Sequence, residues 1–329
     1  MKRLKPVISL LLAGSLIGLV GCGENQLKEK EAKASEQQGK ITNTKNQVEK
    51  KEEKPVVVNI VEPETKKIIK SFIPKDFGYK TDIEQYKVEL EKWAKELARG
   101  TEAAPGYDER MILDKIDANG QVIKGSPQTV LDEEELTDRL LQASEKGGNV
   151  ELPLYVTASG YNVEDVSHLG EVVVAAYTTK FNSNVAGRTK NIELSAQAIN
   201  NLIIGNGDSF SFNTTVGPSD AAHGYQKAEE IMDGKLVEGY GGGICQTSST
   251  LFNAVDQLGV SYIEKHNHSL HVGYVPTGRD ATVSYGGKDF RFKNTTGVPL
   301  LVKAIVGKGT LTIELRTSRI YSEQMKKAV

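Results

Sequence analysis

One stretch, Gly241-Gly242-Gly243-Ile244-Cys245-Gln246, runs three glycines directly into a cysteine. The residues after it, 247–258, have the apolar spacing of a helix, with Leu251, Val255 and Leu258 on one face. Cys245 is therefore predicted at or near a helix N-terminus, where free N–H groups and the helix dipole favour a thiolate. The glycines let a ligand or a second backbone approach closely.

A nucleophilic cysteine needs a base, and three histidines follow Cys245 on a predicted strand: His266, His268 and His271. Asp280 or Asp289 is the candidate to orient the second ring nitrogen of that base. Gln246 and the backbone amides around Cys245 are candidates to hold a developing oxyanion. In the alternative without chemistry, Cys245 packs as a small hydrophobic residue.

Two other kinds of site are open at this point. If the histidine segment is a strand, His266 and His268 share one face, and His271 or Cys245 would complete a tetrahedral zinc site. A groove for a glycan or a stem peptide is the other alternative, shaped by Gly241, Gly242, Gly243, Arg188, Asn213 and Asp280. We predict no metal and no cofactor.

The N-terminal segment predicts export and lipidation. Lys2 and Arg3 precede an apolar run of about 14 residues, which is shorter than the roughly 20 that span a bilayer. The run ends in Leu19-Val20-Gly21-Cys22, which resembles a bacterial lipobox. Residues 1–21 are then a signal peptide, and Cys22 carries the lipid, such as palmitate. An uncleaved anchor helix or a plain secretory signal is the alternative.

Composition bounds the rest of the chain. Residues 22–55 are charged and almost free of apolar side chains, which predicts a disordered tether. The formal net charge is −2 and no basic stripe with interleaved aromatics occurs, so nucleic acid is not an expected partner. With Cys22 acylated, Cys245 is a lone thiol in an exported protein, which suggests reactivity or a partner.

The hydrophobic pattern predicts an α+β fold, with mixed helices and antiparallel sheets. A small α+β domain is expected at residues 56–165, and a second domain with a β-rich C-terminal part at residues 166–320. The first domain has a helix whose stripe is Ile83, Tyr86, Leu90, Trp93 and Leu97, started by a Thr81–Glu84 capping box and ended by Gly100. Other predicted elements are a hairpin at Asn119-Gly120, helices at 132–146 and 189–203, and strands at 150–156, 171–179, 281–283, 290–292, 298–306 and 310–315.

The second domain resembles the VanW-like family over about residues 178–317. The residues that carry the resemblance include Thr178-Thr179-Lys180-Phe181, Arg188, Asp208 to Asn213, Gly241 to Ala254, His266-Asn267-His268-Ser269, Tyr274-Val275-Pro276, Gly278 to Val283 and Asp289 to Asn294. His268 lies in the family's His-Ser block, which makes it the first candidate for the base. Gly147-Gly148 and Leu152-Pro153 give the first domain a likeness to a peptidoglycan-binding type of domain.

The resemblance implies a role at the cell envelope. We expect a lipid-anchored protein on the extracytoplasmic face of the cell membrane, which binds peptidoglycan or a wall precursor as an accessory protein. The alternative is an acyl-transfer enzyme on stem peptides that uses Cys245 and His268.

Overall fold

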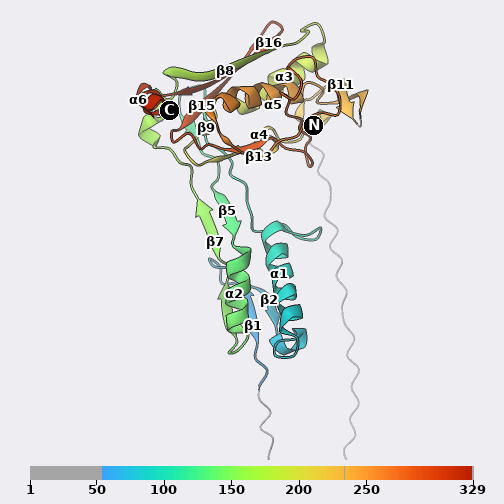
Figure 1. The fold of residues 1–329 in the computed structure, drawn as a ribbon, viewed down its shortest axis with the longest axis vertical. Coiled ribbons are helices and arrows are strands. Elements are labelled where there is room, and N and C mark those ends of the chain that lie inside the picture. Colours follow the sequence, from blue (N-terminus) through green and yellow to red (C-terminus); the bar gives the residue numbers. More distant parts are fainter. Residues whose placement is uncertain (1–53, 233, 328–329) are drawn as a thin grey trace, which may run out of the picture. The chain divides into compact units, whose positions relative to one another are not determined.

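Helices and antiparallel sheets alternate along the chain, as the sequence predicts (Figure 1). This computed structural model describes residues 54–232 and 234–327. The predicted signal peptide, Cys22 and nearly all of the predicted tether lie outside the described residues. In the described part of the chain, no helix is both long enough and apolar enough to cross a membrane.

The first hydrophobic core packs two helices against a three-stranded sheet. The strand order is β2-β1-β6, and β1 pairs antiparallel with β2 and parallel with β6. The core is formed by buried side chains from all of these elements. They are β1 (Val58–Val61), β2 (Ile68–Phe72), α1 (Ile83–Arg99), α2 (Glu133–Ala143) and β6 (Gly148–Glu151).

Helix α1 follows its predicted stripe closely. Tyr86, Leu90 and Trp93 are buried, whereas Ile83 at the first turn is exposed. The predicted capping box is wrong, because the N-cap is Asp82, whose Oδ1 accepts from the Gln85 N–H at 3.1 Å. A carboxylate at this position also has a favourable interaction with the helix dipole.

Short paired strands connect the elements of this region. The predicted Asn-Gly hairpin is present as β3 (Lys115–Ile116) and β4 (Val122–Ile123), with Gly120 at φ 79°. The single strand predicted at 150–156 is two strands, since β6 ends at Glu151 and β7 (Leu154–Thr157) pairs with β5 (Gln128–Leu131). Pro153 lies between them and has no N–H to continue a ladder.

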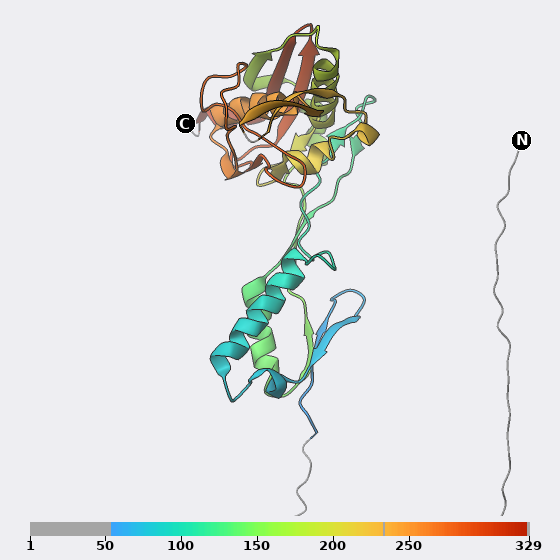
Figure 2. The ribbon, with the colours of Figure 1, turned by 90° about the vertical axis from the view of Figure 1, so that its right-hand side faces the viewer.

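The second hydrophobic core is built on a four-stranded antiparallel sheet of order β8-β16-β15-β9. Helices α3 and α5 contact this sheet and each other (Figure 2). The predicted helix 189–203 ends earlier, because Ile203 pairs with Leu301 in the sheet. The elements are β8 (Val172–Lys180), α3 (Ala186–Ile199), β9 (Ile203–Ile204), α5 (Ile244–Val255), β15 (Leu300–Gly307) and β16 (Thr310–Thr317).

A smaller sheet and a hairpin complete this region. Strand β14 lies between β10 and β13, and β11 pairs with β12. The strand predicted at 281–283 is absent, and these residues are part of a long loop after β13. The elements are β10 (Ser209–Ser211), α4 (Phe212–Val216), β11 (Lys227–Met232), β12 (Lys235–Tyr240), β13 (Ser261–Glu264), β14 (Arg291–Lys293), α6 (Arg319–Lys327) and the 3-10 turns Pro74–Phe77, Val163–His168, Ala221–His223 and Asp256–Leu258.

Some residues before position 165 pack in the second core. Met111 and Leu113 belong to the second core, together with residues that follow position 170. Arg110 also binds the buried Asp289, with Nη1 3.1 Å from Oδ2. The described residues from Lys54 onward group as one compact unit. The predicted boundary between two domains stays a prediction.

Candidate active site

The glycine run places Cys245 in the first turn of α5. Gly243 is the N-cap at φ 116°, a backbone conformation that favours glycine. A side chain at Gly242 would meet the carbonyl oxygens of Glu229 and Ala228 at 2.6 and 2.7 Å. The helix can therefore begin this close to β11 only because position 242 carries no Cβ. Cys245 lies two residues after the N-cap, near the start that the sequence predicts.

Helix α5 is unusual in that its polar residues are buried. Thr247, Ser248, Ser249 and Thr250 are all fully inaccessible to solvent. The Thr247 and Thr250 hydroxyls bond to Ser195 at 2.7 Å and Thr179 at 2.8 Å, which ties α5 to α3 and β8. Because buried polar groups are costly unless paired, these bonds fix the position of the helix.

The same helix holds the loop that faces the cysteine. The Ser249 hydroxyl donates to the Cys245 carbonyl oxygen at 2.6 Å and accepts from the Ala281 N–H at 2.9 Å. Ser248 donates to the Ala281 carbonyl oxygen at 2.5 Å. Asn253 donates to the Arg279 carbonyl oxygen at 2.7 Å. Residues 279–283 are thus positioned by hydroxyl and amide groups of α5.

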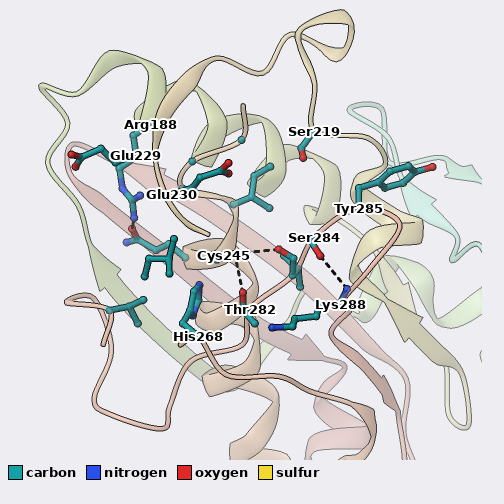
Figure 3. Close-up of a pocket in the computed structure, with 18 of the residues that line it drawn as sticks. Arg188, Ser219, Glu229, Glu230, Cys245, His268, Thr282, Ser284, Tyr285 and Lys288 are labelled. Atoms are coloured by element: carbon teal, nitrogen blue, oxygen red, sulfur yellow. Dashed lines mark hydrogen bonds between the residues drawn. The ribbon is translucent and has the colours of Figure 1, made fainter. Parts of the chain in front are cut away.

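The thiol of Cys245 is half-buried against this loop (Figure 3). Its Sγ lies 3.4 Å from the Val283 carbonyl oxygen and 3.7 Å from Thr282 Oγ1. The Ile244 and Gln246 N–H groups donate to Gly241 and Gly243. In the described residues, the Cys245 N–H has no acceptor. Such a free amide at a helix start can donate to an oxyanion.

His268 is held by Asp280. Its Nδ1 lies 2.7 Å from Asp280 Oδ2, and its backbone N–H donates to the same oxygen at 2.6 Å. Asn267 donates to the other carboxylate oxygen at 2.7 Å. The side chains of His268 and Asp280 are only 6% and 9% exposed. With Nδ1 engaged, Nε2 is the nitrogen available to the cysteine, and the ring points toward Cys245 in Figure 3.

The pKa directions agree with an interacting pair. Burial raises the pKa of the Cys245 thiol, but the side-chain interaction with His268 and the charge of that ring, with smaller contributions from Val283 and Thr282, outweigh this, so the net shift is downward. Burial lowers the pKa of His268, and its interactions with Cys245 and Asp280 outweigh this, so its pKa is raised. The pKa of Asp280 is lowered, because hydrogen bonds from His268 and Asn267 outweigh burial. These directions favour a thiolate beside an imidazolium.

Cys245 and His268 line a pocket of about 670 Å³. The predicted groove residues Gly241, Gly242, Gly243, Arg188 and Asn213 line it as well. Asn213 uses its amide to brace the pocket wall, since Nδ2 donates to the carbonyl oxygens of Ser284 and Lys288 at 2.9 and 3.0 Å. The structure therefore brings most of the predicted site residues together around one cavity, whereas Asp280 lies behind His268 and does not line it.

Two candidates have other contacts than those predicted. Both amide N–H groups of Gln246 are used inside the protein, on Thr179 Oγ1 at 2.9 Å and the Lys180 carbonyl oxygen at 3.0 Å. Gln246 is thus not placed to donate to an oxyanion. Asp289 accepts from Ser211 at 2.6 Å and from the Asn213 N–H at 2.9 Å, so Asp280 alone orients His268.

The remaining histidines do not gather around a metal position. His266 Nε2 lies 2.9 Å from Glu264, and the exposed His271 lies 3.3 Å from Thr277. Within residues 54–232 and 234–327, no group of three or more His, Cys, Asp or Glu side chains is placed to hold a metal ion. His168 and His223 are exposed and pair with Glu171 and Asp220.

Some pocket residues were not among the candidates. Tyr274, which lies under the Arg188 guanidinium, has a pKa raised by burial and by the nearby Cys245. Glu230 of β11 has a pKa raised by burial. Tyr274 falls in the Tyr274-Val275-Pro276 block of the VanW-like resemblance, which assigns it no role, and Glu230 stands in no pattern of its own in the sequence. Their place at the pocket depends on how the β11–β12 hairpin and the 265–290 loop fold around the start of α5.

The fold and the site together define an α+β domain in which a cysteine and a histidine line one pocket and an aspartate holds the histidine. Residues 187–316 match the family described as VanW like protein. A Bacillus subtilis (strain 168) protein named uncharacterized protein YoaR is 44% identical over 164 residues, which are 50% of this chain and 54% of that protein. The vancomycin B-type resistance protein VanW of Enterococcus faecalis (strain ATCC 700802 / V583) is 32% identical over 111 residues, 32% of this chain and 40% of that protein.

Residues 187–316 of this chain are therefore similar to the VanW-like family. The chain spans about half the length or less of the curated relatives that it matches. No solved structure gives a significant match to it.

Proposed function

We propose that this protein is a thiol-dependent acyl-transfer enzyme of the cell envelope, with Cys245 as nucleophile and His268 as general base. The observation that carries the proposal is the arrangement around the thiol. Cys245 stands at a helix start on a pocket, beside an imidazole whose Nδ1 is 2.7 Å from a buried carboxylate. In such an arrangement the base activates the nucleophile, and the third group orients the base.

The residues support a complete reaction on an amide. His268 accepts the Sγ proton, and the thiolate forms a bond to the carbonyl carbon. The free Cys245 N–H donates a hydrogen bond to the oxyanion that forms. The C–N bond then breaks as His268 returns the proton to the leaving amine, and a thioester remains on Cys245. Attack by water gives hydrolysis, and attack by a second amine gives transfer.

The proposed substrate is peptidoglycan or a wall precursor, and the proposed location is the extracytoplasmic face of the membrane. Support for the location comes from the lipobox-like segment that ends at Cys22. Support for the substrate comes from this location and from the similarity to VanW-like proteins, since one relative is named a vancomycin B-type resistance protein. Cys22→Ala is expected to release the protein from membranes or leave an unprocessed precursor. Wild-type protein found wholly in the soluble fraction would contradict the anchor.

Thiol chemistry is tested by alkylation of the full chain with iodoacetamide across pH. Mass spectrometry of the Cys245 peptide keeps Cys22 out of the measurement. We expect the midpoint well below the roughly 8.5 of a free thiol. Cys245→Ser is expected to keep the fold and to abolish release or transfer of stem peptides from purified wall fragments. A thiol that titrates like free cysteine, or that reacts only after unfolding, would defeat the enzymatic proposal.

An accessory binding role is the second candidate, and the rim of the pocket favours it. Leu236, Tyr240 and Tyr285 line the pocket and are 64%, 44% and 58% exposed. Exposed apolar side chains around a cavity mark a surface that a ligand can cover. If the domain only binds, Cys245→Ser will be retained on purified wall sacculi as strongly as the wild type, and neither protein will alter the wall fragments.

A further inference from the structure

The Arg188 guanidinium lines the pocket without an acidic partner. Arg188 stands in the first turn of α3 and is half-buried. Its Nη2 donates to Gln246 Oε1 at 2.9 Å, and its guanidinium lies 5.8 Å from the centre of the Tyr274 ring. In the part of the chain that the structure describes, no Asp or Glu oxygen comes within 4.0 Å of it. A partly desolvated cation without a counter-charge is costly, unless a ligand supplies one.

Gln246 orients this cation without neutralising it. Its two amide N–H groups are donated to Thr179 and the Lys180 carbonyl, so the oxygen is the end that faces Arg188. Gln246 is itself buried, which fixes the direction of the bond. Gly243 leaves room for the arginine, since a Cβ there would lie 3.1 Å from Arg188 Cγ. The guanidinium is held in place by this one hydrogen bond, so most of its five N–H donors are available to a ligand.

The arginine is also close to the reaction centre. Gln246 follows Cys245 directly, and Arg188, Cys245 and His268 line the same pocket (Figure 3). Glu229 and Glu230 line this pocket from β11, and neither reaches Arg188. Their charge disfavours an anion on the β11 side. A planar guanidinium fork matches a carboxylate in two parallel hydrogen bonds, which a lysine cannot reproduce.

We propose that Arg188 binds a carboxylate of the substrate, so that the site selects peptides with a free carboxylate near the amide that Cys245 attacks. The inference rests on the proposed acyl-transfer function and specifies its substrate class. Arg188 is a binding residue in this scheme, whereas Cys245 and His268 carry the bond changes.

Two small alkylating reagents test the inference on the full chain. Iodoacetate carries a carboxylate and iodoacetamide is its neutral counterpart. The rate ratio of iodoacetate to iodoacetamide at Cys245, divided by the same ratio for free cysteine, measures anion selection beside the thiol. We expect this normalised ratio to fall by about tenfold in Arg188→Gln, the factor that one hydrogen bond to a charged group contributes. Arg188→Lys should retain part of it, because the charge stays and the fork is lost.

Matched variants make the result decisive. Lys288→Gln removes another positive charge from the lining of the same pocket and should leave the ratio within about twofold, since exposed charges are screened. Glu229→Gln should raise the ratio, because it removes repulsion. If Arg188→Gln leaves the normalised ratio unchanged and His268→Asn lowers it, the imidazolium is the group that selects the anion, and the inference is overturned. Thermal melting verifies that each variant is folded.

The two proposals fail separately. If iodoacetamide labels Cys245 with the pH curve of a free thiol, the acyl-transfer proposal fails whatever the ratio is. If the thiol pKa is depressed and Arg188→Gln leaves the ratio unchanged, only the carboxylate proposal fails.

Discussion

Helices α1 and α5 achieve burial by different means. Helix α1 exposes one face and buries Tyr86, Leu90 and Trp93 on the other. Helix α5 is buried nearly all round, including a run of four hydroxyl residues, 247–250. The first helix is held mainly by apolar packing, and the second also by hydrogen bonds to α3, β8 and the 279–283 loop. Apolar packing tolerates small shifts, but directional bonds fix the cysteine against the residues around it.

The largest expected effect comes from removing the base beside α5. In His268→Asn the two largest influences that lower the thiol pKa are lost, while burial, the largest influence, still raises it, so the Cys245 pKa should rise relative to the wild type. The wild-type alkylation rate should rise as pH increases through the lowered thiol pKa, and the variant curve should lie at higher pH. Acyl transfer near pH 7 should fall by about 10²–10⁴-fold. Coincident pH curves would show that His268 does not activate the thiol.

A deletion in the core under α1 should affect stability and leave the chemistry alone. Leu90 is fully buried, so Leu90→Ala should lower the free energy of unfolding by about 2–5 kcal/mol, as measured by urea denaturation. Val88 on the same helix is 55% exposed, and Val88→Ala should cost less than about 0.5 kcal/mol. Alkylation of Cys245 in the folded Leu90→Ala protein should keep the wild-type pH curve. A shifted curve would mean that the two regions are coupled.

A hydroxyl deletion on α5, in contrast, should change both the unfolding free energy and the alkylation of Cys245. Ser249→Ala leaves the buried Ala281 N–H without its acceptor, at a cost of about 1–3 kcal/mol in unfolding free energy. Because residues 279–283 lose an anchor, the alkylation rate at Cys245 should also change. Ser261→Ala, at an exposed position on β13, is the control and should change neither quantity. An unchanged rate in Ser249→Ala would show that the loop is held without this bond.

The smallest expected effect concerns the start of α1. Asp82→Ala should lower the unfolding free energy by about 1 kcal/mol, because it removes the acceptor of the Gln85 N–H. Thr81→Ala should cost less, since Thr81 bonds only to the Gly78 carbonyl at an exposed position. If Thr81→Ala costs more than Asp82→Ala in a denaturant titration, the capping box expected from the sequence is the better description.

The same contrast explains what the sequence could predict. The stripe of α1 follows the helical period, because one face meets a core and the other meets water. The start of α5 was also predictable, from the glycines before Cys245. The burial of residues 247–250 was not, because their partners lie on elements far away in the chain. The choice between Asp280 and Asp289 required the path of the loop after β13, which no periodic pattern encodes.

Gln246 illustrates a second limit of sequence reasoning. Its neighbour is the nucleophile, and an amide there suggests an oxyanion donor. Its direction depends on Thr179 and Lys180 at the end of β8, which accept both amide hydrogens. The residue type and the spacing placed Gln246 correctly beside the nucleophile. Only the three-dimensional contacts show that its side chain orients Arg188 and does not donate to the substrate.

The close approach of the glycine run to its surroundings has a consequence for genetic variation. Any side chain at position 242 meets two carbonyl oxygens of β11, and positions 241 and 243 have positive φ angles. Missense changes across three neighbouring codons should therefore inactivate the protein through its backbone. In a saturation mutagenesis map, the intolerant interval would extend well upstream of the thiol. Positions without any reactive group would then be as constrained as the nucleophile itself.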